Sequence, residues 1–420
     1  MRDHSNHIEV SREQAVELLG NAVTFNPKIE TVKLDVSCVG RVLAADAVAK
    51  LDMPNCLTCK MDSVAVHWDD FKDGAPDTTG WQRGRDWEFA NTGIGMPEGF
   101  DTAIVIEHVV LSEDNTTISF NALPSKQYAG TSPAGSRMRK GDVLVPAGSM
   151  LTPLLISHIA SGNNTEVSVI ARPKVAFIPT GSELVVPGSE IPRGKNIETN
   201  SLLAAAKIAG WGGECIVWDI IPDDPDKIKV AVLEAVSICD IVVVNAGSSK
   251  GSDDWNIEML EEIGQVLYHE TNHGPGHHSS GSVVEGVPIV GISGPPGGAA
   301  FTMDFYLYPL MRRHFGQSIE LKKIDVRLME GFSKKDPQQK KPSAETAKGE
   351  ARPNIVADGR EFFGIKQLKI SMDGTEVWAL PATTSHVGAP EAETMDCYFA
   401  LSSLRKTPQK GDTITVDLRP

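Results

Sequence analysis

The stretch KVAFIPTGSE, residues 174–183, sets a short apolar run directly before a loop of threonine, glycine, serine and glutamate. The same order recurs twice, in apolar runs at 240–244 and 287–290 that are followed by loops at 245–254 and 291–300. Each run predicts a buried strand, because an unbroken apolar run of this length is typical of a strand covered on both faces. Helical segments between the runs make the order β–α–β, which indicates a three-layer α/β domain with a mostly parallel sheet.

The loops after these three runs are the strongest indication of function. In an open α/β sheet, ligands bind outside the carboxyl ends of the strands, so three such loops on one edge would form one pocket. Glycine allows backbone N–H groups to approach a phosphate, and acidic side chains hold a metal or orient water. The sequence therefore predicts a site for a phosphate-bearing ligand at this edge of the sheet.

The composition narrows the class of protein. At 420 residues the chain is too long for one ordinary core, which predicts about two to four domains. The net charge of −15 argues against broad nucleic-acid binding, although a local pocket can still bind a small anion. No apolar run approaches the roughly 20 residues that cross a bilayer, and the polar N-terminus lacks a signal-peptide core. We therefore expect a cytoplasmic protein that binds neither membrane nor nucleic acid.

The cysteines fit this expectation, since six thiols in a cytoplasmic chain of this size do not indicate a disulfide framework. Cys56 and Cys59 form one C-x-x-C pair. A structural zinc ion usually takes four ligands, and no second pair is present. The favoured interpretation is two loop thiols, with a metal or redox role left open.

Helix signals and changes of pattern divide the chain into domains. Ser11 and Gln14 form a capping-box pattern before one helix, and Thr152-Pro153 begins another. We expect these two helices to pack together, and a further helix at 303–315 to close the α/β domain. The expected domains are a discontinuous helical linker domain (9–45 plus 134–170), an inserted small β domain (46–133), the α/β domain (171–317), and a C-terminal β-barrel-like domain (318–420) with a mobile insertion at 333–353.

Several short segments are specific as a set. They are PNCLTCKMDSVAV at 54–66, Asn91-Thr92-Gly93 with Pro97-Glu98-Gly99, Thr180-Gly181-Ser182-Glu183-Leu184, the turn at 196–200, Pro222-Asp223-Asp224, and 247–254 with Gly247, Ser249, Gly251 and Asp254. Their order and content resemble the MoeA family, including the gephyrin E domain, over about residues 9–420. The resemblance implies a homodimer whose α/β domain is like that of MogA and MoaB.

The family inserts molybdenum into adenylylated molybdopterin, so the resemblance implies this reaction, with molybdate as the second substrate. A MogA-type adenylyltransferase and molybdoenzymes are the implied protein partners. Two alternatives stay open. One is a paralogue that binds or delivers molybdopterin or finished cofactor without catalysis, and the other is a scaffold that docks partners through 333–353.

Two family loops differ in this chain. The family's Lys-Pro-Gly-Lys-Pro becomes HGPGHH at 273–278, and its Leu-Pro-Gly-Asn-Pro becomes ISGPP at 292–296. We expect His273 and His277 to replace the lysines as anion donors, with affinity rising as the pH falls through the usual His range. A metal site of His269, His273 and His277 would need a helix, which Gly274-Pro275-Gly276 disfavours.

The candidate site residues follow from the loops and the resemblance. Asp62, Asp223 and Asp254 are expected to hold Mg²⁺ beside the pyrophosphate and, with Glu183, to serve catalysis. The expected substrate-binding residues are Thr92, Thr180, Gly181, Gly247, Ser249, Lys250, Gly251, His273, His277, Gly294 and Pro296.

Simpler interpretations of three of these segments remain. Asp223 has the position of an N-cap for the helix after Pro225. Glu183 would serve equally as a brace within a dimer, and 247–251 as a tight strand–helix turn.

Overall fold

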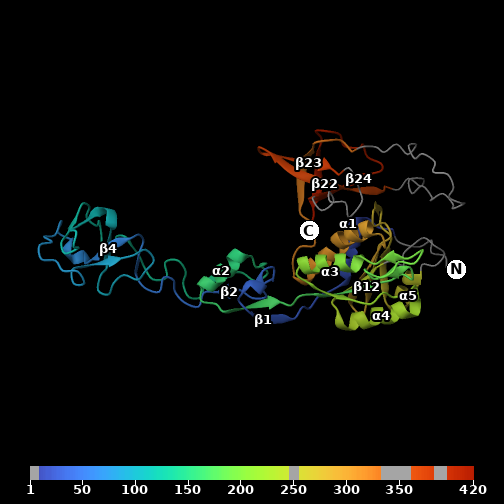
Figure 1. The fold of residues 1–420 in the computed structure, drawn as a ribbon, viewed down its shortest axis with the longest axis horizontal. Helices are drawn as coiled ribbons and strands as arrows, with labels where there is room; N and C mark the ends of the chain where they lie inside the picture. The colour runs from blue at the N-terminus through green and yellow to red at the C-terminus, as the bar shows by residue number, and fades with distance from the viewer. Residues whose placement is uncertain (1–8, 246–254, 333–360, 383–394) are drawn as a thin grey trace. The chain divides into compact units, whose positions relative to one another are not determined.

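The computed structural model of this chain describes residues 9–245, 255–332, 361–382 and 395–420. The loop at 246–254 and the insertion predicted at 333–353 lie outside these ranges. The chain divides into two compact units, one formed by 29–170 and the other by 1–28 together with 171–420 (Figure 1).

A six-stranded sheet is the centre of the unit that contains 171–420. Its strands lie in the order β15 (Glu214–Val217), β12 (Lys174–Pro179), β16 (Ile241–Asn245), β20 (Val287–Ile292), β19 (Ser280–Val284) and β17 (Gln265–His269). The first four strands pair in parallel, and β19 and β17 pair in antiparallel fashion. The predicted mostly parallel sheet is confirmed.

Alternate side chains of the buried strands enter two different cores. Val175 and Phe177 of β12 lie in the core beneath one set of helices, and Ala176 and Ile178 lie in the core on the opposite face. Helices α1 and α3 contribute residues to the first core, and α4 and α5 contribute residues to the second. The helices are α1 (Arg12–Ala22), α3 (Asn200–Gly210), α4 (Pro225–Ile238), α5 (Trp255–Ile263), α6 (Pro296–Thr302) and α7 (Tyr308–His314). The three-layer architecture is therefore confirmed.

The first helix, α1, packs against the sheet. Its capping box is present, because Ser11 accepts from Gln14 N and the Gln14 side chain accepts from Ser11 N at 2.9 Å. The helix buries Ala15 and Leu19 in the same core as Tyr268 of β17. The division into units groups α1 with the sheet and α2 (Pro153–Ser161) with 29–170, and the expected packing of these two helices stays a prediction. Backbone pairing of Val10 with the segment after β17 holds the start of α1 at the sheet.

The closing helix begins earlier than predicted. Pro296 takes an N-terminal position of α6, and a π-helical turn at Met303–Leu307 continues it into α7. The third loop therefore spans 293–295 only, and the predicted start at 303 is wrong. Proline suits this position because its missing N–H has no helical partner there.

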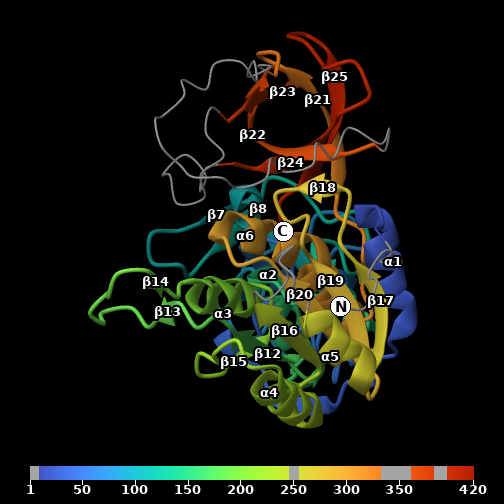
Figure 2. The same cartoon turned by 90° about the vertical axis from the view of Figure 1, so that its right-hand side faces the viewer.

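The C-terminal strands close into a barrel. They are β21 (Lys323–Leu328), β22 (Phe363–Asp373), β23 (Glu376–Pro381), β24 (Cys397–Ser402) and β25 (Thr413–Leu418). Because β22 pairs with both β23 and β24, the five strands have no free edge in the ring (Figure 2). A short strand β18 (His273–Gly274) pairs in parallel with the start of β22.

The other unit, 29–170, consists of short strands and one helix with separate hydrophobic cores. Strand β4 (Ser63–Val66) lies between β5 (Trp87–Ala90) and β6 (Thr102–Val105). The paired strands are β1 (Ile29–Lys33) with β11 (Glu166–Ile170), β2 (Ala47–Val48) with β10 (Val143–Val145), β3 (Thr58–Cys59) with β9 (Thr131–Ser132), and β7 (Val109–Leu111) with β8 (Ile118–Phe120). Thr152 caps α2 and Pro153 begins it, as predicted. The domain boundaries predicted near 46, 133 and 318 stay predictions.

No helix in the described part of the chain is long and apolar enough to cross a bilayer.

Candidate functional site

The carboxyl ends of three adjacent strands meet at one edge of the sheet. Pro179 at the end of β12 is in register with Asn245 at the end of β16, and Asn245 is in register with Ile292 at the end of β20. The three strands before the predicted loops therefore end at one sheet edge, and residues 246–254 of the second loop lie outside the described residues. This edge is where an α/β sheet binds its ligands.

A pocket of about 430 Å³ lies at this edge. Its lining includes Glu183, Gly294 and Pro296, which the sequence singled out. The remaining lining residues were not among the predicted site residues, although the motif at 196–200 contained five of them. They are Leu184 of β13 (Leu184–Val185), Asn196 and Ile197 of β14 (Asn196–Ile197), Glu198, Thr199, Asn200, Asn245 and Pro295.

Asn245 and Asn200 connect the loops that surround the pocket. The backbone oxygen of Asn245 accepts from Thr180 N and from Thr180 Oγ1, both at 3.0 Å. The amide nitrogen of Asn200 donates to Asn245 Oδ1 at 2.9 Å and to Gly294 O at 2.8 Å. Thr180 is fully buried and does not line the pocket, so its hydroxyl holds the loop instead of facing a ligand.

The side-chain carbonyl oxygen of Asn200 lacks a hydrogen-bond partner among the described residues. Asn200 Oδ1 is buried and has no hydrogen-bond partner within the described residues. The hydrogen bonds determine which atom of this amide is the nitrogen. If nitrogen and oxygen were exchanged, the oxygen would face two other acceptors, Asn245 Oδ1 and Gly294 O. Buried acceptors are normally satisfied, so an N–H donor of a bound molecule is the natural partner for this atom.

Two glutamates have distinct local roles. Gly181 has a φ of +150°, and a Cβ there would lie 2.7 Å from Glu183 Oε2, so glycine gives this carboxylate room to fold back over the loop. Glu198 accepts from Ser201 N at 2.9 Å and also from Ser201 Oγ. Glu198 therefore caps the start of α3, where Thr199 makes no side-chain cap.

Asp223 bonds to the first loop. Its Oδ2 accepts from Ser182 N at 2.9 Å, and its own N–H donates to Ser182 Oγ at 3.0 Å. The N-cap of α4 is Asp224, which accepts from Lys227 N at 3.3 Å. The simpler interpretation of Asp223 as the helix cap is therefore wrong, and the described structure gives its Oδ1 no hydrogen bond.

Asp62 and Thr92 lie together in the unit 29–170. Asp62 Oδ1 accepts from Thr92 N at 2.8 Å and from Thr92 Oγ1 at 3.0 Å. The backbone N–H, followed by the hydroxyl, holds the pKa of this exposed carboxylate below its usual value. Asp62 is thus ionised near pH 7, and no described residue forms a hydrogen bond with its second oxygen.

The histidine segment contradicts the expectation for His273. Its side chain is only 1% exposed, with Nε2 at 2.6 Å from Tyr306 Oη and Nδ1 at 3.1 Å from Pro275 O. Burial lowers the pKa of His273 to about 4, so the ring is neutral near pH 7. A buried, neutral ring with both nitrogens bonded does not replace a lysine as an anion donor.

Two further predictions for this segment concern a metal site of His269, His273 and His277 and the role of His277. His269 ends β17 and His273 lies in β18, so no helix aligns His269, His273 and His277, and this histidine triad does not form. His277 lies instead beside Glu270 and His278.

The C-x-x-C pair is not supported as a metal site. Cys59 is buried, its thiol donates to Asn91 O at 2.9 Å, and burial raises its pKa. Cys56 is exposed. Within the described ranges, neither belongs to a group of three or more side chains with metal-ligand spacing.

The remaining predicted residues lie outside the described residues. They are Gly247, Ser249, Lys250, Gly251 and Asp254. Their expected roles in phosphate and Mg²⁺ binding stay predictions.

Comparison with known proteins gives consistent results. Residues 10–162 match the family described as MoeA N-terminal region (domain I and II), and residues 176–313 match the probable molybdopterin binding domain. The chain is 27% identical over 418 residues to a molybdopterin molybdenumtransferase from Haemophilus influenzae, covering 96% of this chain and 97% of that protein. A protein of the same name from Staphylococcus aureus is 27% identical over 366 residues, covering 82% and 86%.

Solved structures show the fold. The crystal structure of a molybdopterin biosynthesis MoeA protein from Pyrococcus horikosii has a TM-score of 0.75 and 23% identity, covering 98% of this chain and 99% of that one.

Proposed function

Since the chain belongs to the MoeA family, we propose that it is a transferase that inserts molybdate into adenylylated molybdopterin and releases AMP. The observation that carries the proposal is the pocket at the ends of β12, β16 and β20, with the unsatisfied Asn200 Oδ1 in its lining. A pterin ring presents N–H donors, and an acceptor fixed by two further hydrogen bonds would orient such a ring.

The carboxylates fit a role for Mg²⁺ in this reaction. Asp62 in 29–170 and Asp223 in the other unit are each exposed and have one carboxylate oxygen bonded to a backbone N–H, and no described residue bonds the other oxygen. Mg²⁺ takes one or two carboxylates and completes its shell with phosphate oxygens and water. When bound, it would shield the charge that develops as the pyrophosphate link breaks. Glu183 would orient the substrate at the mouth of the first loop.

A second candidate function is a protein that binds or delivers molybdopterin without catalysis. It is favoured by His273, because the family has a lysine in this loop and the histidine here is buried and neutral. Under either function we propose a cytoplasmic homodimer, with a MogA-type adenylyltransferase supplying the substrate and molybdoenzymes receiving the product.

The test is AMP release from adenylylated molybdopterin, measured with and without molybdate and with and without Mg²⁺. We expect release only when both are present, and a large loss of rate in Asp223→Asn. Asp224→Asn is the matched control, since it removes a neighbouring carboxylate that caps a helix. Tight pterin binding without AMP release would decide for the non-catalytic function, and no pterin binding would refute both.

A further inference from the structure

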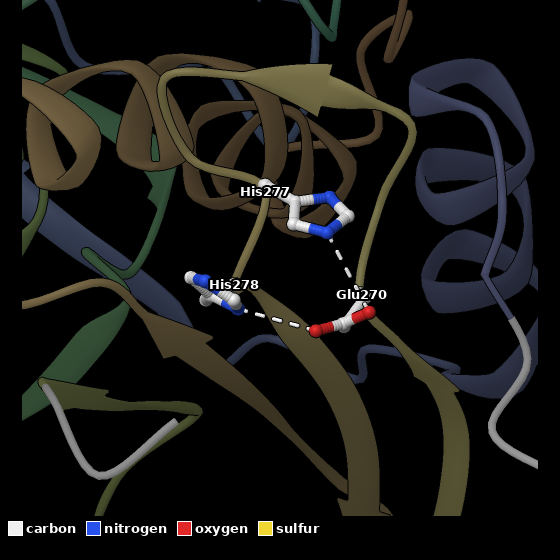
Figure 3. A group of neighbouring side chains, drawn as sticks. All are labelled: Glu270, His277 and His278. Atoms are coloured by element: carbon white, nitrogen blue, oxygen red, sulfur yellow. Dashed lines mark hydrogen bonds and ion pairs between the residues drawn. The ribbon is translucent and has the colours of Figure 1, made fainter. Parts of the chain in front are cut away.

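Three potential metal ligands come together between β17 and β19. They are Glu270, His277 and His278, and one ligand atom of each lies within 4.8 Å of those of the other two (Figure 3). No other set of three or more His, Cys, Asp or Glu residues in the described ranges has this spacing. None of the three lines the pocket described above.

The backbone brings these residues together by folding the segment onto itself. Glu270 N donates to Ser279 O at 2.9 Å, and Thr271 N donates to His277 O at 3.0 Å. Glu270 itself has a φ of +73°, in the left-handed region that a non-glycine residue adopts only at a cost in energy. Such conformations concentrate at binding sites, so the strain at Glu270 supports a role for the position of its side chain.

The orientation of His277 indicates a ligand. Its Nδ1 bonds to Thr271 O, and because a carbonyl only accepts, Nδ1 carries the proton. In the neutral ring the lone pair is then on Nε2, which is buried and makes no hydrogen bond to any described residue. This atom lies 3.5 Å from Glu270 Oε2. A lone pair facing a carboxylate is unfavourable, and a cation between the two atoms converts both into ligands.

The distances suit a small cation with nitrogen ligands. Four tetrahedral bonds of about 2.0–2.1 Å place neighbouring ligand atoms roughly 3.4 Å apart. Glu270 lies 3.5 Å from His277 Nε2 and 3.2 Å from His278 Nδ1. Two imidazoles with one carboxylate suit Zn²⁺ and its first-row neighbours, whereas Mg²⁺ and Ca²⁺ prefer oxygen ligands.

Access to this cluster is from the side of His278. Its side chain is 37% exposed, against 11% for His277 and 13% for Glu270. An ion could therefore enter there and keep water as its fourth ligand. Three ligands of intermediate burial, of which His278 is the most accessible, are consistent with an ion that exchanges with solvent.

We propose that Glu270, His277 and His278 bind a divalent transition-metal cation of the Zn²⁺ class. The bound ion fixes the loop 270–279, which packs against α6. At Gly276 in this loop, a Cβ would lie 3.1 Å from Thr302 Oγ1, so the approach to α6 is close. Because α6 begins at Pro296 in the pocket lining, the ion holds a wall of that pocket in place.

The test titrates Co²⁺ into the untagged, metal-free full chain at about pH 7.5, above the usual His pKa. Visible absorption follows Co²⁺ binding, and Zn²⁺ is then added in competition. We expect one equivalent of saturable binding with a tetrahedral Co²⁺ spectrum that Zn²⁺ displaces. Loss of a residue that only forms a hydrogen bond to a metal ligand weakens metal binding roughly 10–100-fold. His278→Ala and Glu270→Gln each remove a ligand itself, so each should weaken Co²⁺ binding by more than that.

The matched control is His158→Ala, which removes an exposed histidine near the end of α2 and should leave binding unchanged. Circular dichroism of the exposed His278 variant separates loss of a ligand from loss of the fold. The absence of saturable binding would overturn the proposal, as would binding that persists at full affinity in both site variants. Metal binding is the readout, so the outcome is independent of AMP release.

Discussion

Replacement of Asp304 tests a buried contact between the elements that border the pocket. Asp304 is fully buried, its Oδ1 accepts from Lys207 Nζ at 2.5 Å, and its Oδ2 accepts from Tyr398 Oη at 2.6 Å. Lys207 belongs to α3, which begins at Asn200, and Asp304 lies in the helix that begins at Pro296. Asn200 and Pro296 both line the pocket, so the ion pair between Lys207 and Asp304 supports the shape of the pocket.

Asp304→Asn keeps the size of the side chain and removes its charge. Loss of one partner from a buried ion pair costs about 3–5 kcal/mol. Because the Lys207 side chain is 13% exposed, we expect the lower end, about 3 kcal/mol. Tyr398→Phe removes only a hydrogen bond to the carboxylate and should cost about 1.5–3 kcal/mol. The matched control Asp325→Asn changes an exposed carboxylate on β21 and should cost about 0.5 kcal/mol or less.

The assay is urea unfolding followed by circular dichroism and by tryptophan fluorescence, to which all seven tryptophans contribute, including Trp211, whose ring lies 5.3 Å from Lys207 Nζ. The double variant Asp304→Leu with Lys207→Met should recover most of the lost stability, since apolar side chains of similar size replace a buried pair well. The reasoning is refuted if Asp304→Asn costs no more than Asp325→Asn. It is also refuted if the double variant is as unstable as the two single changes added together.

Three further predictions use other parts of the molecule. Asp223→Asn should lower AMP release at least about tenfold with little loss of stability, whereas Asp224→Asn should cost about 0.5–2 kcal/mol in unfolding and retain activity. Gly298→Ala should lower the free energy of unfolding by about 1–3 kcal/mol, because the new Cβ would lie 2.0 Å from a serine hydroxyl. Gly210→Ala has open space around its Cβ and should raise the free energy of unfolding by about 0.5–1 kcal/mol. Both changes are measured by urea unfolding. The folded pKa of His273, about 4, is below its unfolded value, so the unfolded chain binds the extra proton and stability should fall as the pH drops from about 6.5 to 4. The urea midpoint of His273→Gln should not show this pH dependence. If the midpoint of the variant falls with pH as much as that of the unsubstituted chain, the assignment of the pH dependence to His273 is contradicted.

Much of the fold was predictable because its signals are local. The runs at 174–179 and 240–244 are short and apolar throughout, and such runs identify buried strands without reference to other parts of the chain. The caps Ser11 and Thr152 are likewise local, since a cap bonds to the backbone two or three residues away. The helix at 303–315 was predicted too late, because small residues at 297–300 hid the first turns of α6.

The site was predictable in part. Glu183, Gly294 and Pro296 follow strand ends, and parallel topology brings strand ends together. Asn200 and Asn245 were missed, although the motif at 196–200 and the first residue of the second loop contained them. Their importance comes from a hydrogen bond between residues 45 positions apart, which no local pattern expresses.

By itself, the sequence determined the β–α order, the caps and the family, because strand runs, capping residues and loop motifs are properties of contiguous residues. Only the tertiary structure decided three further points. It placed α1 on the sheet, buried His273 beside Tyr306, and brought Glu270 to His277 and His278. Each depends on which strands pair and in what register, and that register is set by the packing of the whole core.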